Sequence, residues 1–290
     1  MVRNILFTLL FVVAIVGCNN DDETYHTIVE EVPDGYTYIP DANFELALMK
    51  DRLDDKLDGK VLTNNIKDVW ELWISNSNIK DLTGIEDFTS LNYLYCIENQ
   101  LTSLDLSNNK ELDAVYCWGN QLTSVDVSNN KELRNLRLDR NQLTFLDVSK
   151  NILLEELWVG KNQLKSLDVS KNTELYFLEC GDNQLTSLVG IHNTLLEGLI
   201  CSNNLLTSLD VSNNTGLTFL VCYNNRLSSL KANNGKTPFP FTLNANNNPE
   251  LFCIDVYEAI APNFTSLWPG GHDTHDAHDP QFTWSENCDY

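Results

Sequence analysis

The sequence predicts a solenoid in which short parallel β-strands stack on one another, one strand for each coil of the chain. The first observation behind this prediction is a unit that recurs every 21 residues. Its copies start at Asn99, Asn120, Asn141, Asn162, Asn183 and Asn204. The second observation is that apolar residues keep the same places in every copy. Such self-similarity is typical of solenoids, in which each coil contacts only its neighbours.

The apolar frame of one unit identifies the kind of solenoid. Leu112, Val115 and Cys117 precede Asn120 in the spacing LxxLxLxxN, and the stretch from Leu175 to Asn183 has the same spacing. This frame, with a period of about 20–29 residues, is the signature of a leucine-rich repeat solenoid. We therefore expect a curved solenoid of about eight or nine coils, with a parallel β-sheet on its concave face and an irregular convex side.

Alternation along each strand predicts which side chains form the core. Val115 and Cys117 should point inward, whereas Ala114, Tyr116 and Trp118 should point outward. The inward column then contains Leu94, Val115, Leu136, Leu157, Leu178, Leu199, Leu220 and Phe241. A second inward column is a ladder of asparagines, whose amides can satisfy the backbone of the turning chain. This Asn ladder contains Asn99, Asn120, Asn141, Asn162, Asn183, Asn204, Asn225 and Asn246.

Composition limits the classes of partner. The 290 residues are 42% hydrophobic, which is enough for one long core, and the formal net charge is −22 with a pI near 4.4. Nucleic acids and anionic membrane surfaces attract clustered Lys and Arg, so this acidity argues against both as direct ligands. We also find no nucleophile elbow, phosphate-binding loop or HExxH motif, and we expect a protein without enzymatic activity and without a cofactor.

The amino-terminal residues 1–17 are predicted to be a signal peptide. Arg3 precedes the apolar residues 5–16, a run too short for a comfortable membrane span. Residues 15–18, Ile-Val-Gly-Cys, resemble a bacterial lipobox, which implies cleavage before Cys18 and a lipid on its thiol. The alternative is an ordinary signal peptide with an incidental Cys. Residues 18–38 are predicted to be an acidic flexible tether.

The next segment, residues 39–77, is predicted to hold an amino-terminal cap and the first coil. A short helix is expected over residues 40–49, with Asp41 as its N-cap and with Phe44 and Leu48 on the face that covers the open end of the solenoid. The leucine-rich repeats should then occupy residues 78–248, and residues 249–290 should form a carboxy-terminal cap.

Two stretches carry a resemblance to a known family. Residues 39–45, Ile-Pro-Asp-Ala-Asn-Phe-Glu, resemble the opening of leucine-rich repeat surface proteins from flavobacteria. Residues 78–86 resemble these proteins and also the repeats of internalins. The chain is thus similar to bacterial leucine-rich repeat surface lipoproteins of the flavobacterial or Bacteroidetes type. That resemblance implies an outer-membrane lipoprotein, and the acidic residues after Cys18 resemble the signal that exports such lipoproteins to the cell surface; a solvated linker is the alternative reading.

The carboxy-terminal segment resembles the closing cap of the same proteins, and the resemblance implies a disulfide between Cys253 and Cys288. The remaining cysteines of the mature chain share one inward column with Leu138 and Val159, which indicates small core residues. We expect buried free thiols at Cys96, Cys117, Cys180, Cys201 and Cys222, because five in a column cannot all pair and parallel side chains lack the torsion of a disulfide.

Two groups of polar residues raise the question of metal binding. The side opposite the sheet carries a column of aspartates, for which we favour hydrogen bonding to the following turn over calcium binding. Its members are Asp105, Asp126, Asp147, Asp168 and Asp210. His272, His275 and His278 lie in the carboxy-terminal cap with a spacing that suits one Zn or Ni ion, but a solvated loop is the preferred interpretation.

The outward positions of the sheet are the candidate ligand-binding residues, because they are rich in aromatic side chains that would face water. These residues are Tyr93, Tyr95, Tyr116, Trp118, Arg137, Trp158, Phe177, Phe219 and Tyr223. The alternative is that aromatic residues simply suit a pleated surface. We expect a surface-displayed module for protein–protein interaction or adhesion. The second hypothesis is a glycan-binding lipoprotein, because the same rings can stack on sugars.

Overall fold

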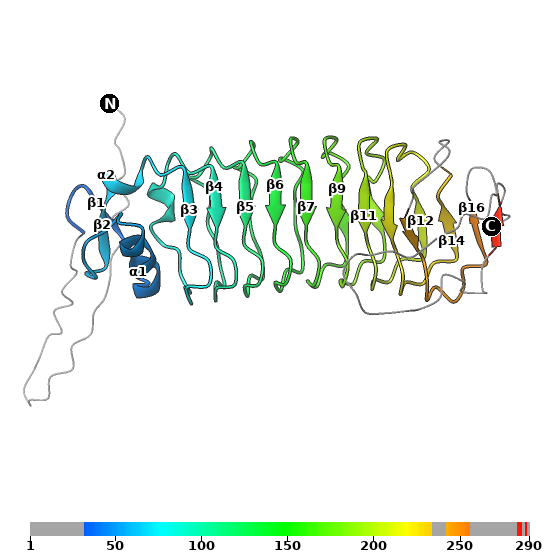
Figure 1. The fold of residues 1–290 in the computed structure, drawn as a ribbon, viewed down its shortest axis with the longest axis horizontal. Coiled ribbons are helices and arrows are strands. Elements are labelled where there is room, and N and C mark those ends of the chain that lie inside the picture. The colour runs from blue at the N-terminus through cyan, green and yellow to red at the C-terminus, as the bar shows by residue number, and fades with distance from the viewer. Residues whose placement is uncertain (1–31, 234–241, 256–282, 286–287, 289–290) are drawn as a thin grey trace, which may run out of the picture.

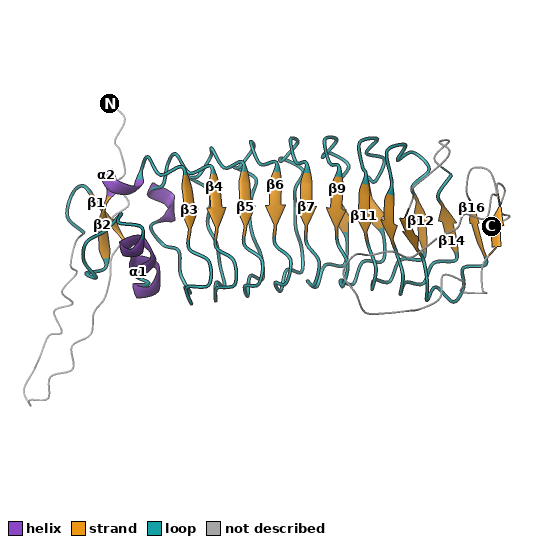
Figure 2. Cartoon of the chain, in the orientation of Figure 1, coloured by secondary structure: helices purple, strands orange, loops and turns teal. Residues whose placement is uncertain are grey.

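The computed structural model describes residues 32–233, 242–255, 283–285 and 288. Parallel strands, one from each successive coil, stand side by side along the long axis, and a small mixed unit lies at the amino-terminal end (Figure 1). In the described part of the chain, the helical segments all lie at that end (Figure 2). The predicted leucine-rich repeat solenoid is therefore confirmed.

The amino-terminal unit covers the first coil. It contains β1 (Tyr36–Tyr38), α1 (Ala42–Lys50), β2 (Lys60–Leu62) and α2 (Thr63–Ile66), and the 3-10 helix η1 (Ile85–Asp87) follows in the first coil. Asp41 caps α1 as predicted, since its Oδ1 accepts hydrogen bonds from the amides of Asn43 and Phe44 at 2.8 and 3.2 Å. Phe44 is fully buried and stacks on Phe88, so the helix closes the open end of the core.

One sheet of nine strands runs through the repeats in the described residues. All its strand pairs are parallel, and its order is β15-β13-β11-β9-β7-β6-β5-β4-β3. We call it the main sheet. Its strands are β3 (Glu71–Trp73), β4 (Tyr93–Tyr95), β5 (Ala114–Tyr116), β6 (Asn135–Arg137), β7 (Glu156–Trp158), β9 (Phe177–Glu179), β11 (Gly198–Ile200), β13 (Phe219–Val221) and β15 (Thr242–Asn244).

The opposite side of the coils is more regular than we expected. It forms two short parallel sheets and one isolated bridge between Asp105 and Asp126. The strands are β8 (Leu167–Asp168), β10 (Leu188–Val189), β12 (Ser208–Asp210), β14 (Ser229–Lys231), β16 (Cys253–Asp255) and β17 (Thr283–Ser285). The aspartate column acts as predicted, because each carboxylate accepts from the amide of the serine two residues later. The five distances lie between 2.8 and 3.0 Å.

The core column matches the prediction except at its ends. Leu72 begins the column before Leu94, and Leu243 ends it by pairing in register with Leu220. Phe241, which we expected in that place, lies outside the described residues. Its assignment was wrong because the last coil is two residues longer than the 21-residue period. The two extra residues come after Ala232, because Leu227, Leu230 and Ala232 still keep the 21-residue period.

The Asn ladder is confirmed in the regular coils and corrected in the last one. Asn141 shows the pattern, in which Oδ1 accepts from the amide of Leu122 at 3.0 Å and Nδ2 donates to the carbonyls of Cys117 and Leu138 at 3.0 Å. Asn248, not Asn246, makes the equivalent bonds in the last coil, including one from the amide of Leu227 at 3.0 Å. The two extra residues again explain the difference.

A second ladder, which we did not predict, lines the other side of the core. In it, the side-chain amide of each asparagine donates to backbone carbonyls of the preceding coil, as Asn130 does to Leu106 and Asn109 at 2.9 Å. Its members are Asn109, Asn130, Asn151, Asn172, Asn193 and Asn214. The signal was the Asn that ends each Ser-Asn-Asn or Ser-Lys-Asn turn, and the Ile-His-Asn at residues 191–193, which we had interpreted only as polar turns.

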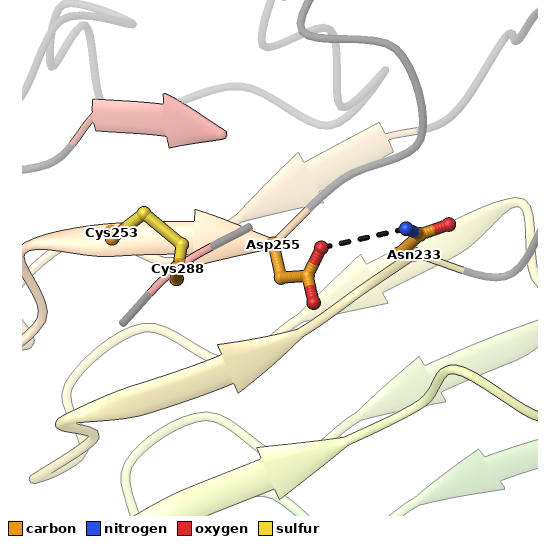
Figure 3. Close-up of a disulfide and its surroundings, with 4 residues drawn as sticks. All are labelled: Asn233, Cys253, Asp255 and Cys288. Atoms are coloured by element: carbon orange, nitrogen blue, oxygen red, sulfur yellow. Dashed lines mark hydrogen bonds between the residues drawn. A yellow bond between two sulfur atoms is a disulfide. The ribbon is translucent and has the colours of Figure 1, made fainter. Parts of the chain in front are cut away.

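The cysteines follow the two patterns that we expected. The five cysteines of the inward column are buried and unpaired, and the sulfurs of Cys96 and Cys117 lie 2.7 Å apart. Burial raises the pKa of the Cys201 thiol to about 12. A disulfide joins Cys253 to Cys288, with 5.9 Å between their Cα atoms (Figure 3). It ties the end of the chain to β16, beside a 3.5 Å hydrogen bond from Asn233 to Asp255.

Candidate binding face

The candidate site is the outward face of the main sheet. In most of its strands the central residue is buried and the two flanking residues are partly exposed, because side chains alternate along a strand. The third residues of successive strands lie in register and form a line across the coils. We call its first five members the aromatic column. They are Trp73, Tyr95, Tyr116, Arg137 and Trp158.

The rings at the amino-terminal end of the aromatic column stack face to face. The centroids of Trp73 and Tyr95 lie 3.8 Å apart with 10° between the ring planes. Tyr95 and Tyr116 are 4.8 Å apart with 4° between their planes. Tyr95 therefore has a neighbour on each face. Aromatic pairs in the offset-stacked arrangement add about 0.5–1.5 kcal/mol for each pair.

The other end of the aromatic column is filled in the same way. The guanidinium of Arg137 lies 4.3 Å from the centre of the Trp158 ring, and Phe177 stacks on that ring at 4.7 Å. Arg137 belongs to β6 and Phe177 to β9, the strands on either side of β7, so the two side chains cover opposite faces of Trp158. Phe177 in turn occupies the space over Gly198, where an added Cβ would lie 2.5 Å from the ring.

Two strongly exposed aromatic residues of this face, Trp70 and Trp73, were not among the predicted site residues. Trp70 and Trp73 are 54% and 58% exposed, and Trp70 meets Tyr93 edge to face with 4.9 Å between the ring centres. They belong to the first coil, where Ser77 replaces the ladder asparagine, so the LxxLxLxxN frame did not include them. The repeated tripeptide Glu-Leu-Trp, at Glu71–Trp73 and again at Glu156–Trp158, was the available signal.

The other predicted residues lie at different distances from this cluster. Trp118 follows β5 and is half-buried, with the guanidinium of Arg140 5.7 Å from its ring centre. Phe219 and Tyr223 belong to the coil of β13, which is separated from the strand of Phe177 by β11. The structure thus gathers Trp70, Trp73, Tyr93, Tyr95 and Tyr116 at one end, while Phe219 and Tyr223 lie several coils away.

Carboxylates accompany the tryptophans of the aromatic column. The indole N–H of Trp73 donates to Glu71 and that of Trp158 donates to Glu156, both at 3.1 Å. Tyr176 also donates its hydroxyl to Glu156. A hydrogen bond to Asp113 raises the pKa of the Tyr93 hydroxyl. The aromatic face is therefore bordered by negative charge, in line with the acidity of the whole chain.

Glu179 continues the line beyond Trp158 and is held against the sheet. Its two carboxylate oxygens accept from the amides of Gly160 at 2.9 Å and Gly181 at 3.0 Å. A Cβ added at Gly160 would clash with this carboxylate, so a side chain there would displace Glu179 from the two amides. Burial, together with the nearby Asp139, raises the pKa of Glu179 to about 7 despite these hydrogen bonds. Its charge thus changes in the neutral pH range.

Several predicted sites fall outside the described residues. These are the lipidation site Cys18 and the histidines His272, His275 and His278. Within the described ranges, no group of three or more His, Cys, Asp and Glu side chains is arranged to hold a metal ion. No helix there has both the length and the apolar character that a membrane crossing requires.

Comparison with solved structures places the fold among bacterial leucine-rich repeat proteins. The functional domain of InlJ from Listeria monocytogenes, which includes a cysteine ladder, matches with a TM-score of 0.56 and 30% identity over 76% of this chain. This chain spans 56% of that domain. Internalin C2 from the same species matches with a TM-score of 0.62 and 20% identity, over 78% of this chain and 100% of that one.

A leucine-rich repeat protein of Leptospira interrogans matches with a TM-score of 0.55 and 18% identity, over 67% of this chain and 63% of that one. No protein-family model matches the sequence, and a search of the curated proteins finds no match. The last two structural likenesses establish the fold alone, whereas InlJ shares both the fold and a ladder of cysteines.

Proposed function

We propose that this protein is a surface-displayed binding module that holds a protein partner on the outward face of the main sheet. The observation that carries the proposal is the aromatic cluster of Trp70, Trp73, Tyr93, Tyr95 and Tyr116, two of whose members are more than half exposed. Exposed Trp and Tyr side chains that form one patch are the residues that dominate binding energy at protein interfaces. Solenoids present such extended surfaces to their partners.

The stacking geometry favours a protein over a glycan as the ligand. Sugars bind aromatic side chains through the ring face, but the faces of Tyr95 and Trp158 are covered by their neighbours in the sheet. Their outward edges remain for contact, and these suit the mixed apolar and polar surface of a protein. Trp73 has one ring face that no neighbouring ring covers, and this face is where a sugar could stack if the ligand were a glycan.

The test is capture of a partner by the full chain and by a Trp73→Ala/Tyr95→Ala variant. The matched control is Phe145→Ser, which removes a 66% exposed ring outside the main sheet and installs the residue found at Ser103 and Ser124. We expect the double variant, but not the control, to lose the partner. Capture should disappear after the extract is treated with protease and should weaken with salt because the face is bordered by charge.

Other outcomes are equally informative. If periodate oxidation of glycans abolishes capture while proteolysis does not, the ligand is a glycan. If the double variant folds and captures as well as the unmodified chain does, the outward face is not the binding surface.

We further propose that the module is anchored in the outer membrane through a lipid on Cys18 and faces the outside of the cell. The lipobox-like residues 15–18 and the acidic residues that follow support this proposal. Cys18→Ala should abolish incorporation of labelled fatty acid and release the protein from the membrane fraction. Protease added to intact cells should digest the lipidated protein, and resistance to it would contradict surface display.

A further inference from the structure

We infer that the open face of Trp73 is a subsite for an arginine side chain of the protein partner. This inference rests on the proposed function and names the chemistry of one contact in it. The strands β3 and β7 have the same sequence, Glu-Leu-Trp, so the two tryptophans occupy the same strand position. The two tryptophans differ in what covers them.

At Trp158 the chain itself supplies a cation. Arg137, from the preceding strand β6, places its guanidinium 4.3 Å from the ring centre. Glu156 accepts a hydrogen bond from the indole N–H at 3.1 Å, and the carboxylate of Asp139 lies 3.8 Å from Nε of the stacked Arg137. A planar, weakly hydrated guanidinium on an aromatic face is a favourable cation–π contact, and a nearby carboxylate adds to it.

At Trp73 the same arrangement lacks its cation. Glu71 holds the indole N–H at 3.1 Å, as Glu156 does in β7. Tyr95 covers the ring face that points along the solenoid, but β3 is the edge strand of the main sheet, so among the described residues no strand precedes it there. In the described part of the chain, no arginine or lysine is placed over this ring, and the residue is 58% exposed.

The charge around the ring selects the ligand. Glu71 is exposed at the rim, and the chain carries a formal net charge of −22. An arginine of a partner would complete at Trp73 the pair that Arg137 completes at Trp158. Arginine is preferred over lysine because its planar group stacks on the ring and can still donate to a carboxylate.

The experiment titrates the full ¹⁵N-labelled chain with N-acetyl-argininamide and follows the indole N–H resonances. We expect the Trp73 resonance to shift saturably, and the neutral isostere N-acetyl-citrulline amide to bind at least about three-fold more weakly, since the cation is the attracted group. Glu71→Gln should weaken arginine binding by a similar factor. In Trp73→Ala, the backbone amides of β3 and β4 should show no saturable shift with arginine, whereas the control Phe145→Ser should retain the shifts at Trp73 and at these amides.

A second variant tests the internal comparison. Arg137→Ala uncovers Trp158, so its indole resonance should begin to respond to the arginine probe and give the variant a second site. Equal shifts with arginine and citrulline probes, or no gain at Trp158 in Arg137→Ala, would overturn the inference. A response of Trp73 to methyl glucosides in place of arginine would assign the ring to a sugar.

The failures of the two proposals are distinguishable. Loss of partner capture in the Trp73→Ala/Tyr95→Ala variant without any arginine response would keep the binding face and reject the arginine subsite. An arginine response at Trp73 with unchanged capture would keep the subsite and reject the face as the place where the partner binds.

Discussion

At the scale of single residues, Glu179 links the binding face to pH. In the unfolded chain its carboxyl ionises near the ordinary value of 4.5, whereas in the folded protein burial raises its pKa to about 7. Between these values the folded state binds more protons than the unfolded state. Raising the pH through this window therefore lowers the free energy of unfolding, and the stabilisation is fully present only below pH 4.5.

We predict that Glu179→Gln removes this part of the pH dependence, because the amide cannot ionise. The difference in unfolding free energy between the variant and the unmodified protein should change by about 1–3 kcal/mol between pH 4.5 and 8, after allowance for partial exposure of the carboxylate. Urea denaturation at several pH values measures it. Parallel pH profiles for the two proteins would show that Glu179 ionises normally.

The Asn ladder also acts residue by residue. We predict that Asn141→Ala destabilises the fold by about 3 kcal/mol or more, since it leaves the amide of Leu122 and the carbonyls of Cys117 and Leu138 without their partner. Gln142→Ala is the matched control, because the neighbouring side chain is exposed. Chemical denaturation compares the two, and equal stability would mean that the backbone finds other partners.

At the scale of the repeat, the regular coils were predictable and the irregular ones were not. A fixed period with fixed apolar positions determines inward and outward side chains, so Leu94 to Leu220 and the ladder asparagines could be assigned directly. The last coil was misassigned because its two extra residues leave no visible break in the sequence pattern. Several asparagines also lie close together near residue 246, so more than one of them fits the ladder position. Only strand pairing distinguishes Asn246 from Asn248.

The binding face was also predictable in the regular coils and not in the first coil. Alternation predicted which aromatic residues face outward, and it found Tyr95, Tyr116 and Trp158. It could not show that their faces are covered, because stacking depends on side-chain torsions and on which strands are neighbours. Trp70 and Trp73 were missed since the first coil departs from the frame, and the Glu179 pKa depends on burial that no local pattern reveals.

The cysteine column gives a prediction for the stacked elements as a group. Burial raises the pKa of Cys96, Cys180, Cys201 and Cys222, so their thiolate fractions at pH 8 should be very small. We predict that iodoacetamide leaves the five thiols of the column unmodified in the folded protein and modifies them in urea. Peptide mass mapping reads this out, and rapid labelling without denaturant would contradict a closed core.

At the scale of the whole molecule, we expect the disulfide to stabilise only the carboxy-terminal end of the solenoid. We predict that Cys253→Ala/Cys288→Ala costs about 3–4 kcal/mol at the carboxy-terminal end, given the 35-residue separation of the pair. Because each coil contacts only its neighbours, hydrogen exchange should accelerate around β14 and β16 and stay unchanged around β4 and β5. Uniform acceleration along the chain would instead indicate that the solenoid unfolds as a single unit.

The burial of the cysteine column has a consequence for how the disulfide forms. An unfolded chain in an oxidising compartment offers many wrong partners to Cys253 and Cys288, because five further thiols lie in the repeats. Once the coils have stacked, the thiols of the column are buried and cannot react with an oxidant or a disulfide. Among these cysteines, Cys253 and Cys288 can then react only with each other. Correct pairing of Cys253 with Cys288 is therefore favoured when the repeats fold before this disulfide forms.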